Sequence, residues 1–419
     1  MQKGGTVAAQ LRSSLIRTDA GEGLLKRAAR RDTRRKGKNM FIHTTVSRIV
    51  HGRGCIAQAP EEVRRLGGSR VLIVTDSGLA DFGVQKPLEK ALEKAGMPFH
   101  LYAEAEIPPS VAAITRCAAA ARSFGADALL GIGGGSALDT TKAAALLLTN
   151  EGPVSRYFDS RNEPGPLPPL LLAPTTASGS EMSPVAELIA EDGSRRSVVA
   201  DSLYADVVLL DPDLTISLPA RLTAMAGAAA FVSSMESYVG KAATLMTDNL
   251  NTMAMQLIVH NIRQAYVNGG DRDARVNMLY ASALAGMGVS NTQSGIIHAV
   301  AEAVPPRYRL PQTLLTACLA PMCMEFNALA RPEKYARISM IFGEQVDRNV
   351  FAQAKRAAVH MLGLLNDIDL GSGLAAYGIE RRDLPGIAER AAGNVRLMGN
   401  NPRPATAQQI LELLEANHR

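Results

Sequence analysis

Short runs of aliphatic and β-branched residues alternate with longer stretches of helical spacing from about residue 41 onward. The runs are four or five residues long, as in strands of a sheet that is covered on both faces. The stretches between them repeat their apolar residues with the period of an amphipathic helix. This alternation predicts an α/β domain with a largely parallel sheet. We expect strands at 71–75, 99–102, 128–132, 170–173 and 207–210, and helices at 85–95 and 111–124.

The pattern changes beyond about residue 214. Asp211-Pro212 is a turn signal, and after it Ala, Leu and Met recur at helical spacing without a further strand signal. The second half therefore reads as an all-helical domain. We predict three regions: a disordered basic extension over 1–39, a Rossmann-like α/β nucleotide-binding domain over 40–213, and an all-α domain over 214–419.

Composition is that of a globular protein, with 47% hydrophobic and 20% charged residues. The net charge of +5 comes from the N-terminus, where residues 1–39 hold 11 Lys/Arg against 3 Asp/Glu. The remaining 34 Lys/Arg and 37 Asp/Glu make the rest of the chain mildly acidic, which argues against a nucleic-acid groove. An Arg-rich start also fits a transit peptide, and Met40 offers an alternative start codon.

Four cysteines are scattered along the chain without CxxC spacing, so the sequence indicates neither a disulfide framework nor a zinc ribbon. No run of about 18 uncharged apolar residues is present, so we expect no membrane span. We therefore expect a cytoplasmic protein that has no nucleic-acid or membrane partner.

A glycine-rich turn follows the expected strand at 128–132 and precedes a helix that begins near Ala137. Glycines let the backbone approach a phosphate closely, and free amides at a helix start complement its charge. The alternative is a tight strand-to-helix turn that binds no ligand. However, Asp139 and Lys142 follow the turn at helical spacing and give the longer motif GGGSxxDxxK. We predict that the motif binds the cofactor through Gly133, Gly134, Gly135, Ser136, Asp139 and Lys142.

A second polar loop follows the next expected strand and contains Thr175, Thr176 and Ser180. Loops at the carboxyl ends of parallel strands gather at one edge of the sheet, where nucleotides bind. Asp76 ends the first strong strand, where a carboxylate bonds both ribose hydroxyls and repels a 2′-phosphate, so we predict NAD. The alternatives are that the hydroxyls are turn residues and that Asp76 caps the following helix.

Together these motifs resemble the iron-containing (group III) alcohol dehydrogenase family, which is related to glycerol dehydrogenase and dehydroquinate synthase. The resemblance covers about residues 41–419. It rests on Val74-Thr75-Asp76, the segment from Gly133 to Lys142, the Pro-Thr-Thr loop, Asp211-Pro212 with Leu218-Pro219, and Gly227 through Glu236-Ser237-Tyr238-Val239.

The resemblance implies a dehydroquinate synthase-like fold and NAD(P)-dependent interconversion of an alcohol with an aldehyde or ketone. It places a small substrate in a cleft between the domains and implies a homo-oligomer. Arg195 and Arg196 lie where family members often keep a basic residue near the cofactor, so Arg196 is a candidate contact, with solvated surface arginines as the alternative.

The family pattern also includes an Asp and several His that bind a divalent metal, and here most of these positions differ. Ala229 stands where the Asp belongs and Ser233 where the first His belongs. His298 is retained, but Glu302 replaces the next His and Gln312 the last. Methyl, hydroxyl and amide groups are poor ligands, so we predict no metal site. A two-ligand site from His298 and Glu302, one helical turn apart, is the alternative.

A metal-free dehydrogenase must stabilise the developing alkoxide by proton donation or hydrogen bonds. We predict that His298 is the general acid and that Glu302 raises its pKa. Maleylacetate reductases, a metal-free branch of the superfamily, have a loop similar to residues 178–184. The predicted function is an NAD(H)-dependent alcohol dehydrogenase or aldehyde or ketone reductase that is independent of metal. The alternatives are an inactive nucleotide-binding homologue with a regulatory role and a lyase related to dehydroquinate synthase.

Overall fold

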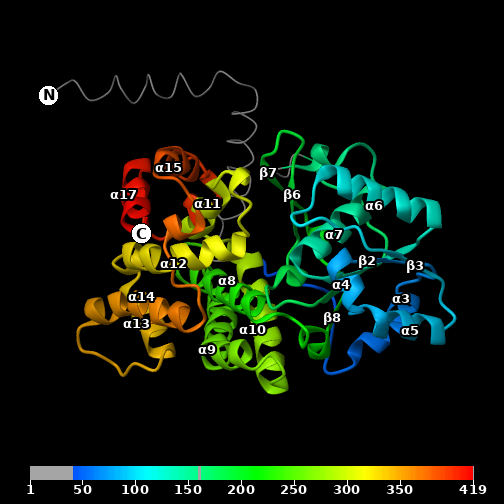
Figure 1. Ribbon diagram of the computed structural model, residues 1–419, viewed down its shortest axis with the longest axis horizontal. Coiled ribbons are helices and arrows are strands. Elements are labelled where there is room, and N and C mark those ends of the chain that lie inside the picture. Colours follow the sequence, from blue (N-terminus) through cyan, green and yellow to red (C-terminus); the bar gives the residue numbers. More distant parts are fainter. Residues whose placement is uncertain (1–40, 159–161, 419) are drawn as a thin grey trace. The chain divides into compact units, whose positions relative to one another are not determined.

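The computed structural model describes residues 41–158 and 162–418, and residues 45–419 form one compact unit. The predicted extension over 1–39 lies outside the described residues. Six parallel strands form the main sheet in the order β1-β8-β5-β4-β2-β3 (Figure 1). They are β1 (Ile49–His51), β2 (Val71–Val74), β3 (Phe99–Tyr102), β4 (Ala128–Gly133), β5 (Leu170–Pro174) and β8 (Val207–Leu210). The predicted parallel α/β fold is confirmed.

Helices cover both faces of this sheet because its strands are apolar on both sides. In β2, Leu72 and Val74 pack toward α6 (Val111–Phe124) and α7 (Gly135–Thr149). Val71 and Ile73 pack on the opposite face against α3 (Ala59–Arg65) and α5 (Lys86–Lys94). All four strand residues are fully buried, as expected for a parallel sheet between two helix layers.

A second, two-stranded sheet had no clear signal in the sequence. It is an antiparallel hairpin of β6 (Val185–Ile189) and β7 (Arg195–Val199). Its strands are only half-buried and contain charged residues, so their alternation is weaker than that of the central strands. The hairpin places Glu187 close to α7, because the Glu187 backbone N–H donates to Asp139 Oδ2 at 3.2 Å.

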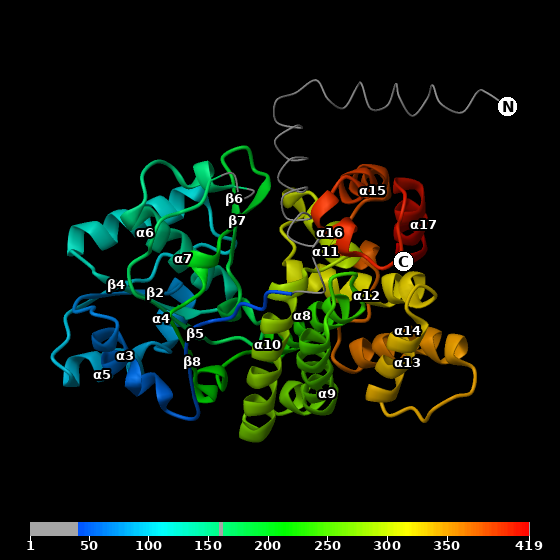
Figure 2. The same ribbon diagram turned by 180° about the vertical axis from the view of Figure 1, so that it is seen from behind.

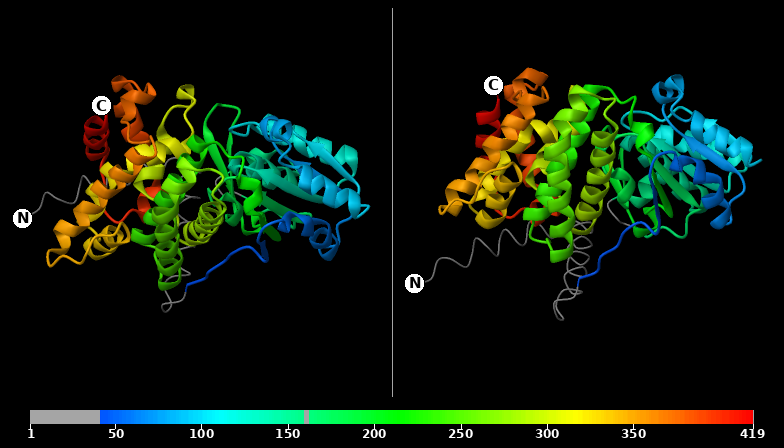
Figure 3. Two further views of the ribbon diagram at one scale, coloured as in Figure 1. Left: turned by 60° about the horizontal axis from the view of Figure 1, so that its bottom comes forward. Right: turned by 90° about the horizontal axis from the view of Figure 1, so that it is seen from below.

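The second half of the chain is entirely helical in the described residues, as predicted (Figures 1 and 2). Three long helices, α8 (Ala220–Val239), α9 (Leu245–Val267) and α10 (Arg272–Thr292), pack against one another (Figure 3). The remainder are α11 (Ile296–Ala303), α12 (Gln312–Ala328), α13 (Pro332–Ile341), α14 (Val350–Asp367), α15 (Leu384–Ala392), α16 (Val395–Asn400) and α17 (Ala407–Asn417). Among the described residues, none of these helices is both long and apolar enough to cross a bilayer.

The two halves meet where the loop after β5 touches α10. A Cβ atom on Gly179 would lie 2.5 Å from the Ser282 carbonyl oxygen, and one on Gly286 would lie 2.3 Å from the Gly179 carbonyl oxygen. Gly179 also has a φ of +86°, a conformation that L side chains rarely adopt. Glycine at both positions therefore lets the loop approach the helix backbone to backbone, which sets the spacing between the sheet and the helical half.

Candidate active site

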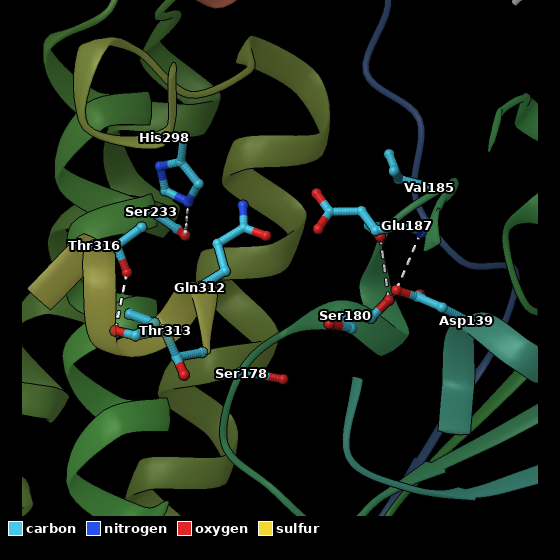
Figure 4. A pocket seen from close by; sticks show the side chains of 12 residues that line it. Asp139, Ser178, Ser180, Val185, Glu187, Ser233, His298, Gln312, Thr313 and Thr316 are labelled. Carbon is cyan, nitrogen blue, oxygen red and sulfur yellow. Dashed lines mark hydrogen bonds between the residues drawn. The ribbon is translucent and has the colours of Figure 1, made fainter. Parts of the chain in front are cut away.

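A cavity of about 180 Å³ lies between the α/β half and the helical half. The α/β half contributes residues from α7, from the loop after β5 and from β6, and the helical half contributes residues from α8, α11 and α12 (Figure 4). The lining residues are Asp139, Ser178, Ser180, Ser183, Val185, Glu187, Ala229, Ser233, His298, Gln312, Thr313 and Thr316.

His298 is held from behind by a carboxylate that is distant in sequence. Its Nδ1 atom lies 2.5 Å from Oε2 of Glu236, whose other oxygen accepts the Ile297 backbone N–H at 2.7 Å. The Glu236 side chain is only 2% exposed. Nδ1–H donation to Glu236 leaves Nε2 to face the cavity, where Ser233 Oγ lies at 3.5 Å (Figure 4).

The surroundings of His298 act on its pKa in opposite directions. Burial alone lowers the pKa of the imidazole, but the charge and hydrogen bond of Glu236, with smaller contributions from Glu302 and Glu187, raise it above its usual value. Glu302 thus acts in the predicted direction, although Glu236 has the larger effect. The sequence pattern did not indicate Glu236 as the partner of His298.

Glu302, the second predicted catalytic residue, does not line the cavity. Its carboxylate accepts hydrogen bonds from Asn394 Nδ2 at 2.9 Å and Arg396 at 3.3 Å. Burial and the charge of Glu187 raise the pKa of this carboxyl against the opposing charge of Arg396. The structure therefore places Glu302 beside the site, and a direct catalytic role stays a prediction.

Four of the five positions that the resemblance assigns to metal ligands line this one cavity, and the fifth, Glu302, does not. Ala229 offers a methyl group, Ser233 a hydroxyl, Gln312 a neutral amide and His298 one imidazole nitrogen. Firm binding of Fe²⁺ or Zn²⁺ needs several anionic or imidazole donors, so this set does not fit the ion. Within the described ranges, no group of three or more His, Cys, Asp or Glu side chains could hold a metal.

Close contacts around the glycine-rich turn explain why its residues are small. A Cβ atom on Gly133 would lie 2.7 Å from Ala137 Cβ, and one on Gly135 would lie 2.9 Å from Ser180 Oγ. Gly134 is the N-cap of α7. Because it has no side chain, the first backbone amides of the helix, which include that of Ser136, have no side-chain cap. This close backbone cradle suits a phosphate group. The predicted contacts of these residues with a cofactor stay predictions.

Lys142 is not exposed to the cavity, unlike its neighbour Asp139. The fully buried ammonium donates to the carbonyl oxygens of Ser180 and Val185 at 2.8 Å each and lies 3.4 Å from both Asp139 Oδ1 and Ser183 Oγ. It thus ties the loop after β5 and strand β6 to α7. Burial raises the pKa of Asp139 to about 6, although Lys142 opposes the shift.

The remaining predicted cofactor residues follow strands of the main sheet, except Arg196, which lies in β7 of the hairpin. Asp76 caps α4 (Ser77–Phe82) by accepting the Leu79 backbone N–H at 3.0 Å, which is the alternative that the sequence left open. Thr176 Oγ1 lies 3.4 Å from Ser178 Oγ, and the Thr175 hydroxyl is buried with no hydrogen-bond partner among the described residues. Arg196 Nε donates to Ser194 Oγ at 3.1 Å within the hairpin.

Comparison with known proteins agrees with this geometry. The profile described as "Iron-containing alcohol dehydrogenase" matches residues 46–212, and "Fe-containing alcohol dehydrogenase family, C-terminal" matches residues 223–418. The chain belongs to the iron-containing alcohol dehydrogenase family. It is therefore an alcohol dehydrogenase-type oxidoreductase, and the predicted family, fold and enzyme class are confirmed.

Individual members of the family cover nearly the whole chain. A sulfoacetaldehyde reductase of Bilophila wadsworthia is 50% identical over 382 residues, which are 90% of this chain and 99% of that protein. An NAD-dependent methanol dehydrogenase of Bacillus methanolicus is 31% identical, over 87% of this chain and 97% of that one. The crystal structure of a 1,3-propanediol oxidoreductase superposes with a TM-score of 0.87 at 30% identity, covering 90% of this chain and all of the other.

A buried carboxyl beside the active site of this dehydrogenase was also missed from the sequence. Glu181, in the short 3₁₀ turn Ser180–Met182, is fully buried, and neither of its carboxyl oxygens has a hydrogen-bond partner among the described residues. Burial raises its pKa to about 7, against the opposing effect of Lys142. Its position directly after Ser180 in a polar loop was the only available signal, and such a position usually indicates an exposed residue.

Proposed function

We propose that this protein is a metal-independent, NAD(H)-dependent aldehyde reductase that also catalyses the reverse oxidation of the alcohol, with His298 as the proton donor in reduction. One observation carries the proposal. Glu236 orients His298 so that its Nε2 faces the cavity. Ala229, Ser233 and Gln312 stand at other positions that the resemblance assigns to metal ligands. The cavity therefore provides a proton donor instead of a cation-binding set.

The residues of the α/β half suit a dinucleotide. The glycine turn and the uncapped start of α7 would hold a pyrophosphate, and Asp76, whose Oδ1 caps α4, would offer its second carboxylate oxygen to the adenosine ribose. When bound, the nicotinamide supplies the hydride that reduces the carbonyl carbon. His298 then delivers the proton to the carbonyl oxygen from Nε2, and solvent returns a proton to the imidazole. The NAD dependence of a relative that is 31% identical supports the choice of cofactor.

The substrate class follows from the most extensive similarity described above. The 50% identity with a sulfoacetaldehyde reductase supports a short aldehyde with an anionic head group, and sulfoacetaldehyde is the first candidate. The cavity of about 180 Å³ has room for a molecule of only a few heavy atoms beside a nicotinamide ring. We further propose a cytoplasmic homo-oligomer. The four cysteines are all free and buried, which is consistent with a reducing compartment.

Purified protein provides the test. Its metal content is measured by mass spectrometry, NADH is titrated by nicotinamide fluorescence, and sulfoacetaldehyde, glyoxylate and propanal are added with and without EDTA. We expect NADH binding, reduction that EDTA does not inhibit, and less than one metal ion per ten chains. Stoichiometric metal with EDTA-sensitive turnover would contradict metal independence. NADH binding without any turnover would instead support the inactive homologue.

His298→Asn is the matched variant for the proton donor, because asparagine keeps a hydrogen-bonding side chain but cannot donate a proton as an acid. We expect kcat to fall by about 10²- to 10⁴-fold, while the Kd for NADH stays within twofold. His360→Asn, on α14 and outside the cavity, is the control and should keep wild-type kcat. Wild-type kcat in His298→Asn would remove His298 from the proposal.

A further inference from the structure

The two walls of the cavity differ in chemistry. The α/β wall carries the carboxyl groups of Asp139 and Glu187 beside three serine hydroxyls, whereas the helical wall carries hydroxyl, amide and imidazole groups and no carboxyl. In Figure 4 the carboxylate of Glu187 stands across the cavity from the Gln312 amide. A carbonyl oxygen accepts hydrogen bonds and gains negative charge during hydride transfer, so carboxylates repel it and neutral donors attract it. The substrate oxygen should therefore face the helical wall.

Ser233 is placed to meet that oxygen. It lies in the middle of α8, and the contact of its hydroxyl with His298 Nε2, at 3.5 Å, is at the limit of a hydrogen bond. The neighbouring Ser234 differs, because its fully buried hydroxyl donates to the Ala230 carbonyl oxygen of the same helix at 2.9 Å. Ser233 thus turns its hydroxyl to the cavity, and Ser234 uses its own within the helix.

Gln312 approaches the same space from α12. It is the first residue of that helix, and its side chain points into the cavity beside His298 and Ser233 (Figure 4). Its terminal amide has two N–H donors. Thr316, one turn further along α12, instead donates its hydroxyl to the Thr313 carbonyl oxygen at 3.1 Å. Gln312 therefore offers a neutral N–H donor to the cavity beside the hydroxyl of Ser233.

We propose that Ser233 and Gln312 are catalytic residues that hydrogen-bond the substrate carbonyl oxygen where a metal cation would polarise it in a metal-dependent relative. The inference rests on the proposed function. In reduction, hydride from NADH forms the new C–H bond, and the carbonyl π electrons move to oxygen. The Ser233 O–H and a Gln312 N–H hold that oxygen until it takes the proton from His298 Nε2, giving the alcohol and NAD⁺.

Two pairs of variants separate donation from space filling. Ser233→Ala removes a hydroxyl, and Ser233→Thr retains it. Gln312→Leu removes the amide, and Gln312→Glu retains its shape but sets a carboxylate against the developing negative charge. If Gln312 only filled space, the Glu variant would be the better tolerated of the two. If it donates to the oxygen, the Glu variant should be the slower enzyme.

The test measures kcat, KM for sulfoacetaldehyde, Kd for NADH by fluorescence and Tm for each variant of the full chain. We expect kcat to fall at least tenfold in Ser233→Ala and Gln312→Leu, and further in Gln312→Glu, with recovery in Ser233→Thr. Kd for NADH and Tm should stay close to wild type. Ser234→Ala, which removes a hydroxyl already bonded within α8, should keep wild-type kcat.

Wild-type kcat in both Ser233→Ala and Gln312→Leu would overturn the inference and leave the reductase itself intact. A Gln312→Glu enzyme that is faster than Gln312→Leu would overturn the role of the amide. Failure of the proposed function has a different signature, because the wild-type protein would then show no NADH oxidation with any aldehyde, or would lose it in EDTA.

Discussion

His298 Nδ1 and Glu236 Oε2 lie 2.5 Å apart, although 62 positions separate the two residues in the sequence. The same carboxylate accepts the Ile297 backbone N–H, so Glu236 holds both the imidazole and the start of α11. Because this bond fixes which ring nitrogen faces the cavity, the orientation of His298 depends on a residue that does not line the cavity itself.

Replacement of Glu236 by Gln should lower kcat by at least about tenfold, because an amide neither stabilises the imidazolium nor favours one tautomer as a carboxylate does. The Kd for NADH should remain within twofold of wild type, since Glu236 lies in the helical half and the expected dinucleotide contacts lie in the other. Steady-state kinetics and a fluorescence titration check both values. Glu325→Gln, an exposed position on α12, is the control. An unchanged kcat would show that His298 orients itself without Glu236.

Lys142→Met should destabilise the protein by about 3 kcal/mol, because it leaves buried oxygens without their donor. Carbonyl oxygens of Ser180 and Val185 each lose a bond of 2.8 Å, and the buried Asp139 loses its cation. Urea unfolding measures the change in the free energy of unfolding. Lys90→Met, an exposed position on α5, should change stability by less than about 0.5 kcal/mol. Equal stability of the two variants would refute the anchoring role of Lys142.

Glu181→Gln should change the pH dependence of stability. The unfolded carboxyl titrates near 4.5 and the folded one near 7, so the folded state holds the proton more tightly. The wild type therefore loses stability as the pH rises from about 4.5 to about 7, whereas a neutral Gln does not. We expect Glu181→Gln to be more stable than wild type by on the order of 3 kcal/mol at pH 8, and by little at pH 4.5.

Thermal unfolding between pH 4.5 and 8 measures this difference directly. Glu106→Gln is a useful comparison of opposite sign, because hydrogen bonds from Ser110 and Arg116 lower the pKa of the Glu106 carboxyl and their weakening should reduce stability. A stability gain for Glu181→Gln that does not vary with pH would mean that the Glu181 carboxyl does not titrate in this range.

Gly286→Ala tests the contact between the two halves. The new methyl group would lie 2.3 Å from the Gly179 carbonyl oxygen and 2.8 Å from Met182 Cβ, so the loop and α10 must separate. We expect a loss of about 1–3 kcal/mol in the free energy of unfolding and a higher Kd for NADH. Gly363→Ala is the matched control in α14. With open space around it, that alanine should stabilise the protein by about 0.5–1 kcal/mol.

Local patterns were sufficient for the main elements. The strands near 71, 99, 128, 170 and 207 and the helix over 111–124 were predicted close to their observed bounds. A buried strand or an amphipathic helix shows its period within a few residues, so it is visible without knowledge of distant contacts. The hairpin of β6 and β7 was not predicted, because its half-buried strands lack that contrast.

The resemblance also indicated which residues stand at the positions that it assigns to metal ligands, and of these Ala229, Ser233, His298 and Gln312 do line one cavity. The hydrogen-bond partners of the site residues were harder to predict from the sequence. Glu236 was seen only as part of a motif, Glu302 was placed in the site but points to Asn394, and Lys142 was expected at a phosphate but serves protein carbonyl oxygens.

The sequence by itself was enough to determine the fold class and the family, since both depend on residue type and on spacing along the chain. Folding decided the rest. Whether a carboxylate orients an imidazole, caps a helix or remains buried without a partner, as Glu236, Asp76 and Glu181 do, depends on which groups the packed core brings within about 3 Å. Those distances arise from contacts between segments that are far apart in the chain.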